Sequence, residues 1–179
     1  MRSIRTNNAA ARRSTKAFTL VEVLVVIFIL GVLAAIVAGV AGYVMKSAAS
    51  RETASTEKVL MQAIQAFHDA NIPQGYPPVT DPNNSGIDLM RYLTGKDPSA
   101  QAAAAKAATD VLLKLPKDAW TGDSNSAVKD SWGHDMHYDP NGGLGGKPVV
   151  ISEGPDGKFG GTSAGDPNGE DDIRSDESQ

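Results

Sequence analysis

The sequence predicts an α+β fold in which one long N-terminal helix packs on a small C-terminal head with short helices and a small antiparallel sheet. Residues 18–45 form an apolar run without Asp, Glu, Lys, Arg or Pro between Val23 and Val44. Residues 47–70 contain no Pro or Gly and continue the helical pattern. Beyond residue 72, Gly- and Pro-rich stretches separate short apolar segments, which is typical of a small, loop-rich head.

The first half of the predicted helix, residues 18–45, is long enough to cross a membrane. Its 22 residues without a charge would extend roughly 33 Å, against a hydrocarbon core of ~30 Å. Five basic residues and no acid precede it, and positive residues stay on the cytoplasmic side. We therefore expect a single membrane helix whose N-terminus is cytoplasmic.

Glu22 is the one carboxylate in this apolar run. An ordinary secretory signal has an apolar region of only ~7–15 residues and then a cleavage site. A plain membrane anchor fits the length and the basic flank, but it leaves Glu22 unexplained, because an ionisable group inside a membrane segment is costly and usually has a partner. Both alternatives explain the segment less well than a functional role for Glu22.

The second half of the helix, residues 46–71, is predicted to be amphipathic. Its apolar positions repeat at helical spacing and comprise Val59, Leu60, Ala63, Ile64 and Phe67. The charged residues available for the wet face are Arg51, Glu52, Glu57, Lys58 and Asp69. Asn71 to Pro73 forms a plausible stop, so one helix is expected from Phe18 to Ala70.

The head divides into a loop and short-helix region, residues 72–128, and a β-region with an acidic, Gly-rich tail, residues 129–179. A short helix is expected around Ile87 to Leu93, ending at Gly95, and the Ala-rich run before Pro116 favours a second helix. The chain has no Cys, which excludes disulfides and cysteine nucleophiles.

Charge and motif content exclude two broad classes of function. Removal of the basic residues 1–17 takes the formal net charge from −4 to −9, and no basic patch follows Lys46, so nucleic acid is not an expected partner. The sequence contains no nucleophile–base pair or phosphate-binding loop, and we expect no enzymatic activity.

The segment Lys16 to Glu22, KAFTLVE, resembles the processing site of type IV prepilins and pseudopilins, in which a basic leader precedes F-T-L-x-E. The resemblance implies that a prepilin peptidase removes residues 1–17 by cutting between Ala17 and Phe18, and that the new Phe18 amine is methylated. Glu22 then becomes the fifth residue of the mature chain, where the family places its glutamate. Ala17 departs from the family's usual Gly. We hypothesise that Glu22 pairs with the amine of a neighbouring subunit and sets the register of assembly.

A second block, residues 129–138, KDSWGHDMHY, resembles the D-P-W-G-x-P-Y-x-Y block of the major pseudopilin of type II secretion systems. In that family the Trp packs in the head and the next residues begin the small sheet, so Trp132 is interpreted as a core aromatic residue. A metal site formed by His134, Asp135 and His137 is not favoured, because residues three apart in a strand point to opposite faces. Turn or solvent positions are expected for both histidines.

A third block, residues 151–173, resembles the S-x-G-x-D-G-x-x-G-G … D-I tail of the same pseudopilin, whose loop binds one Ca²⁺. The resemblance implies that Asp156 and Asp172 are carboxylate ligands, that Glu153 contributes a backbone carbonyl and that Asp171 is an additional ligand. Calcium takes 6–8 oxygen ligands, which an acidic, Gly-rich loop can provide. The alternative is a solvated acidic tail, since eight acids lie between Ser152 and Gln179.

Together these resemblances imply a subunit of a pilus-like filament, most similar to the major pseudopilin of type II secretion systems. Its implied location is the inner membrane with a periplasmic head, and its implied partners are other copies of itself, minor pseudopilins, an inner-membrane assembly platform, prepilin peptidase and membrane lipid. The alternatives are a type IV pilin or minor pseudopilin acting in adhesion, motility or DNA uptake, and a membrane-anchored binding or enzyme domain.

Overall fold

The computed structural model describes residues 18–71, 75–160 and 171–177, which form two compact units, Met1–Gly42 and Tyr43–Gln179. The long helix α1 spans Leu20–Ala70 and contributes to both units. This confirms the predicted helix apart from its first two residues. The predicted leader, residues 1–17 with Ala17, lies outside the described residues.

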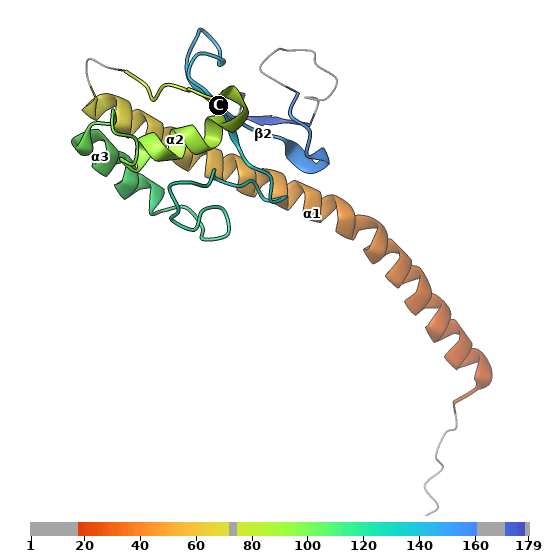
Figure 1. The fold of residues 1–179 in the computed structure, drawn as a ribbon. Helices are drawn as coiled ribbons and strands as arrows, with labels where there is room; N and C mark the ends of the chain where they lie inside the picture. Colours follow the sequence, from red (N-terminus) through yellow and green to blue (C-terminus); the bar gives the residue numbers. More distant parts are fainter. Residues whose placement is uncertain (1–17, 72–74, 161–170, 178–179) are drawn as a thin grey trace, which may run out of the picture. The chain divides into compact units, whose positions relative to one another are not determined.

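In the second unit, two short helices accompany the end of α1. α2 spans Ser85–Leu93 and follows a 3₁₀ turn, η1, at Pro82–Asn84, while α3 spans Ala102–Leu112. Figure 1 shows both helices beside the C-terminal part of α1. The two helices predicted in this region are therefore confirmed, although α3 ends before the Leu113–Leu115 stretch.

The sheet has three antiparallel strands in the order β1-β2-β3, namely β1 His137–Asp139, β2 Val149–Ser152 and β3 Ile173–Arg174. In the first pair Tyr138 lies opposite Val150, and in the second Ser152 lies opposite Ile173. A second 3₁₀ turn, η2, at Gly154–Asp156 follows β2. The short helices and this small sheet, together with α1, give the predicted α+β architecture.

One hydrophobic core joins α1, α2, α3 and the sheet. The buried residues that fill it are at most 9% exposed, and they include Leu60, Ile64 and Phe67 of α1, Leu89, Met90 and Leu93 of α2, Leu112 of α3, and Tyr138 and Val150 of the sheet. The approach of α2 to β1 requires a glycine, because a Cβ on Gly86 would collide with the carbonyl oxygen of Met136 and lie 2.9 Å from the Cβ of Ala127.

Two sequence-based expectations about the core are wrong. Glu57, expected on the wet face of α1, is fully buried. It lies on the same stripe as Thr53, Leu60 and Ile64, which are spaced three or four residues apart and face inward together. Trp132 is only half-buried, and the buried tryptophan of the head is Trp120, whose indole N–H donates to the carbonyl of Asp123 at 2.8 Å.

Candidate functional site

The predicted assembly residue Glu22 forms a capping box with Thr19 at the start of α1. The Thr19 hydroxyl accepts a hydrogen bond from the Glu22 backbone N–H at 3.2 Å, and the Glu22 carboxylate accepts from the Thr19 backbone N–H at 3.4 Å. This reciprocal arrangement satisfies backbone donors that a helix N-terminus otherwise leaves free. Sequence reasoning missed this role, although the spacing T-x-x-E signals it.

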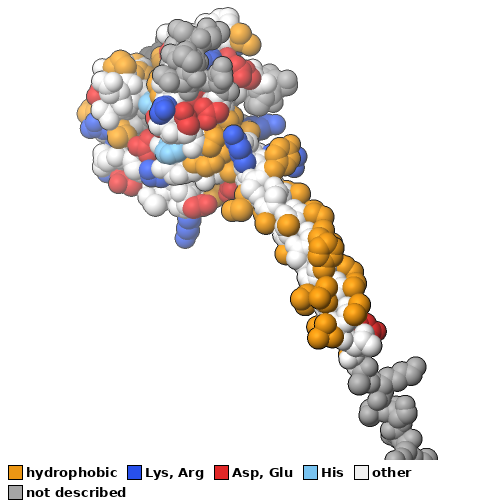
Figure 2. Space-filling model, turned by 90° about the vertical axis from the view of Figure 1, so that its right-hand side faces the viewer, with side chains coloured by type: hydrophobic (Ala, Val, Ile, Leu, Met, Phe, Trp, Pro, Cys, Tyr) orange, Lys and Arg blue, Asp and Glu red, His pale blue; other side chains and the backbone are white. Residues whose placement is uncertain are grey.

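The first half of α1 exposes its apolar side chains on all sides. Large hydrophobic residues from Phe18 to Met45 are 45–80% exposed, and Figure 2 shows the resulting apolar surface. The helix is long and apolar enough to cross a membrane, and no residue in its most apolar stretch of 18 residues is buried. An apolar surface of this size is not stable in water and marks a membrane or protein contact.

In the head, three of the residues predicted as calcium ligands lie within electrostatic range of the fourth, Asp172. Burial raises the pKa of Asp172, and the nearby charges of Asp171, Asp156 and Glu153 raise it further. The Asp172 carboxylate accepts a hydrogen bond from the Gly160 N–H at 3.1 Å through Oδ2, while its Oδ1 is buried without a hydrogen-bond partner among the described residues. A buried, unpartnered carboxylate oxygen among acids is compatible with a bound cation.

The described residues alone do not complete a metal site. Within residues 18–71, 75–160 and 171–177, no three His, Asp or Glu side chains are arranged to hold one ion. Asp156 Oδ1 instead accepts from the Lys158 N–H at 2.9 Å, and Glu153 Oε1 lies 2.9 Å from Nε2 of His137. Residues 161–170, which belong to the same predicted loop, are outside the described residues.

The backbone of this loop depends on a close approach at Gly154. Its φ of 66° lies in the left-handed region, and a Cβ there would collide with the carbonyl oxygen of Asp171. Glycine is the residue that adopts this conformation without strain. Gly154 therefore allows the chain after β2 to approach Asp171 closely.

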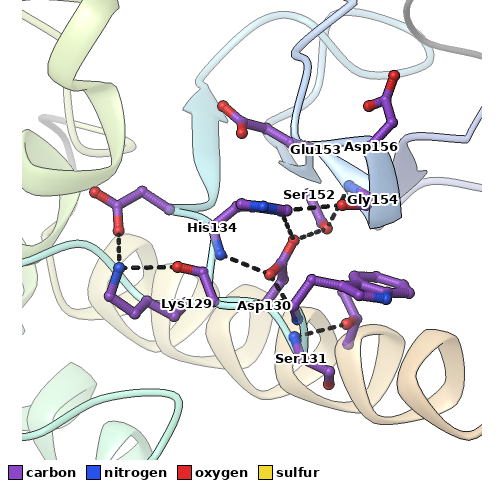
Figure 3. Close-up of polar contacts among 12 residues, drawn as sticks. Lys129, Asp130, Ser131, His134, Ser152, Glu153, Gly154 and Asp156 are labelled. Atoms are coloured by element: carbon purple, nitrogen blue, oxygen red, sulfur yellow. Dashed lines mark hydrogen bonds and ion pairs between the residues drawn. The ribbon is translucent and has the colours of Figure 1, made fainter. Parts of the chain in front are cut away.

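Next to this loop, the buried carboxylate of Asp130 forms the centre of a hydrogen-bond network (Figure 3). Its Oδ1 accepts from the backbone N–H groups of Trp132 and His134, both at 2.9 Å, and its Oδ2 accepts from the Ser152 hydroxyl at 2.7 Å. The side chain of Asp130 is fully buried. In the neighbouring residue, the Ser131 N–H donates to the Thr53 hydroxyl of α1 at 3.1 Å.

The network ties the 130–134 turn to β2 and to α1. His134 Nδ1 lies 3.0 Å from the Gly154 carbonyl, which can only accept, so Nδ1 carries the proton in this contact. Figure 3 shows Glu153 and Asp156 directed away from Asp130. Asp130 thus fixes the base of the loop that bears the predicted calcium ligands, a function the sequence did not indicate.

Ser152, His134 and Asp130 are the residue types of a hydrolase triad, but their geometry is different. The Ser152 hydroxyl bonds the carboxylate rather than the imidazole, and Ser152 is fully buried. A nucleophilic serine must instead reach both the histidine base and the substrate. The three residues therefore form a structural network.

The expectation of turn or solvent positions for both histidines is wrong for His137. His137 belongs to β1. Its ring stacks on that of Phe159, with the ring centroids 4.0 Å apart, and contacts Glu153. His134 does follow the 131–133 turn, but it is partly buried against Gly154. Asp135 pairs with Lys129 at 2.9 Å.

Residues 12–38 match the family described as the prokaryotic N-terminal methylation motif. The chain has a prepilin-type N-terminus. The matched segment covers the predicted cleavage site, Glu22 and the first part of the apolar helix. Together with the exposed apolar surface of α1, it fits a membrane-anchored, pilin-like protein. No curated protein and no solved structure is detectably similar to the chain.

The network predicts that Asp130→Ala strongly destabilises the head. The substitution leaves two backbone N–H groups and the Ser152 hydroxyl without their acceptor, at a cost of about 3 kcal/mol or more in the free energy of unfolding. Chemical denaturation of the full chain in detergent measures this loss. Asp135→Ala is the control, because its exposed ion pair with Lys129 contributes at most about 1 kcal/mol. Equal stabilities of the two variants would contradict the role assigned to Asp130.

Proposed function

We propose that the chain is the major structural subunit of a pseudopilus, the pilus-like filament that drives protein export by a type II secretion system. The methylation motif at residues 12–38 carries this proposal, together with the apolar first half of α1, which no other described residue covers. Such a helix needs a membrane before assembly and other helices after it. A filament of identical subunits provides this second environment, since each helix buries its apolar surface against its neighbours.

The proposed sequence of events begins with prepilin peptidase, which cuts between Ala17 and Phe18 at the cytoplasmic face of the inner membrane. The Phe18 amine is then methylated, and the subunit remains as a single-pass protein with a periplasmic head. An inner-membrane platform, with minor pseudopilins, extracts subunits from the lipid into the filament. The work is mechanical, and no enzymatic step is assigned to this chain.

In this proposal Glu22 changes its partner during assembly. In the single subunit its carboxylate caps the helix through Thr19. In the filament it pairs with the methylated Phe18 amine of a neighbouring subunit, which neutralises both charges in an apolar environment. Removing one member of a desolvated pair typically costs ~3–5 kcal/mol. This cost favours the subunit register in which the two charges meet.

A type IV pilin or a minor pseudopilin is the second candidate, because the matched motif concerns the N-terminus and does not distinguish among these filaments. The resemblance of residues 129–138 and 151–173 to the major pseudopilin favours the first proposal. The aromatic block retains Trp132, Gly133 and Tyr138, and the loop keeps Gly154, Asp156 and Gly157.

We also propose that the loop between β2 and β3 binds one Ca²⁺ as a structural ion. Asp156 and Asp172 would supply carboxylate oxygens, Glu153 a backbone carbonyl, and Asp171 an additional oxygen. The unpartnered Oδ1 of Asp172 and the acids around it support this proposal. The ion would neutralise the clustered charges and hold the loop against the sheet in a chain that has no disulfide.

The Glu22 proposal predicts that charge, rather than capping, controls assembly. Glu22→Gln keeps an oxygen that accepts the Thr19 hydrogen bonds but removes the charge, and it should reduce the number of filaments at least tenfold. Thr19→Ala removes the hydroxyl that accepts the Glu22 N–H but keeps the charge, and it should assemble nearly as well as wild type. Electron microscopy of filaments, at matched levels of processed subunit in the membrane, measures both. Normal assembly of Glu22→Gln would refute the pairing.

The calcium proposal predicts a metal-dependent melting temperature. For the full chain in detergent, Ca²⁺ at 100 times its Kd should add about 2.7 kcal/mol of stability relative to a chelator, which raises the Tm by several degrees. Asp172→Asn should abolish this increase, whereas Asp110→Asn on the exposed side of α3 should preserve it. A melting temperature that Ca²⁺ does not change would remove the site and leave the filament proposal intact.

A further inference from the structure

Glu57 is a buried acid that neither the predicted assembly site nor the calcium loop uses. It lies on the inward stripe of α1, between Thr53 and Leu60, and its exposed fraction is zero. Both of its carboxylate oxygens are buried without a hydrogen-bond partner in the described structure. Burial of an ionised carboxylate without a partner is among the most costly arrangements in a folded protein.

The surroundings of Glu57 disfavour its ionised form. The charged groups that act on it are Asp130 of the 130–134 turn and Asp176 and Arg174 of the C-terminal segment. The Ser152 N–H of β2 is near enough to lower the pKa of Glu57, but it does not form a hydrogen bond of good geometry with the carboxylate. Arg174 is not available as its partner, because its guanidinium already binds Asp176 at 3.2 Å and the Gly142 carbonyl at 3.2 Å. Two acids and one engaged base thus surround the carboxyl group.

These conditions keep Glu57 protonated near neutral pH. Burial is the main cause, and with the nearby Asp176 and Asp130 it raises the pKa of Glu57 from 4.5 to about 9. A protonated carboxyl group is neutral and can be accommodated against β2. Its deprotonation would place a negative charge beside the carboxylates of Asp130 and Asp176.

We propose that Glu57 is a proton-dependent latch: its neutral form allows α1 to pack against β2 and the C-terminal segment, and loss of its proton loosens this contact. The two acids that would be repelled have anchoring roles. Asp130 holds the 130–134 turn to Ser152, and Asp176 accepts the Leu144 N–H at 2.9 Å in the loop between β1 and β2. The latch therefore makes the packing of the head on α1 depend on the pH around the head. The inference does not depend on which filament the chain forms.

The sign of the pH dependence follows from the direction of the pKa shift. The folded protein holds this proton more tightly than the unfolded chain does. The contribution of Glu57 to the stability of the folded protein is therefore fully present below pH 4.5 and is lost as the pH rises towards about 9. Between these limits, each pH unit lowers the folding equilibrium constant about tenfold through this one group. A glutamine at the same position has no proton to lose.

The experiment compares wild type, Glu57→Gln and Glu52→Gln as full chains in detergent, by denaturant unfolding between pH 5 and pH 8.5. Glu52 is an exposed acid on the same helix, so Glu52→Gln makes the same chemical substitution at a position that is not buried. The ratio of the folding constants of Glu57→Gln and wild type should rise about tenfold per pH unit, whatever its value at pH 5. The corresponding ratio for Glu52→Gln should stay constant. A ratio for Glu57→Gln that changes less than threefold over the whole range would overturn the proposal.

Hydrogen exchange tests whether the contact opens locally. At pH 8.5, amides of β2 and of residues 173–176 should exchange at least tenfold faster in wild type than in Glu57→Gln, while the amides of α2 exchange equally in both. Comparison of the two proteins at one pH removes the intrinsic pH dependence of exchange. Equal protection of β2 and the 173–176 segment in both proteins would reject the latch and leave Glu57 with a purely structural role.

Discussion

The docking of the head depends on the buried carboxylate of Asp130, which links segments that are far apart in the sequence. Two backbone N–H groups of its own turn and the hydroxyl of Ser152 bond this carboxylate, and the adjacent Ser131 N–H bonds Thr53 of α1. The turn, the central strand and the long helix therefore share one polar junction. Apolar packing further along α1, around Leu60, Ile64 and Phe67, provides the bulk of the burial, while this junction fixes how the sheet and its loop are placed on the helix.

The same helix serves two environments, and its sequence changes accordingly. Up to about residue 45 every large apolar side chain is exposed, whereas from Thr53 onward the inward stripe is buried under the head. Such a chain is incomplete as a single molecule in water, because its first half has an apolar surface that nothing in the described chain covers. In the proposed filament, a membrane before assembly and neighbouring helices after it would supply what is missing. This requirement, together with the methylation motif, supports a filament subunit more strongly than any feature of the head.

Periodicity predicted the helices well but misjudged polar residues on a buried stripe. The helical pattern predicted α1 to within two residues of its observed start. The predicted breaks at Gly95 and Pro116 lie just after the ends of α2 and α3. Glu57 was misassigned because its chemistry suggested the wet face, whereas its position, three residues before Leu60, required burial. Trp132 was assigned to the core by family resemblance, yet Trp120 fills that role. The Asp130 network was not foreseeable, since its bonds join residues up to 78 positions apart. The carboxylates of the loop could be named from the sequence, but their mutual distances depend on the fold of the head.

The most direct test of the account is the intact mass and N-terminal residue of the protein purified from its host's membranes. The account predicts a chain that begins at Phe18, carries one added methyl group on its amine and lacks residues 1–17. A chain that still begins at Met1 would contradict it, because the long helix would then be a passive anchor. Glu22 would have no neighbouring amine to meet.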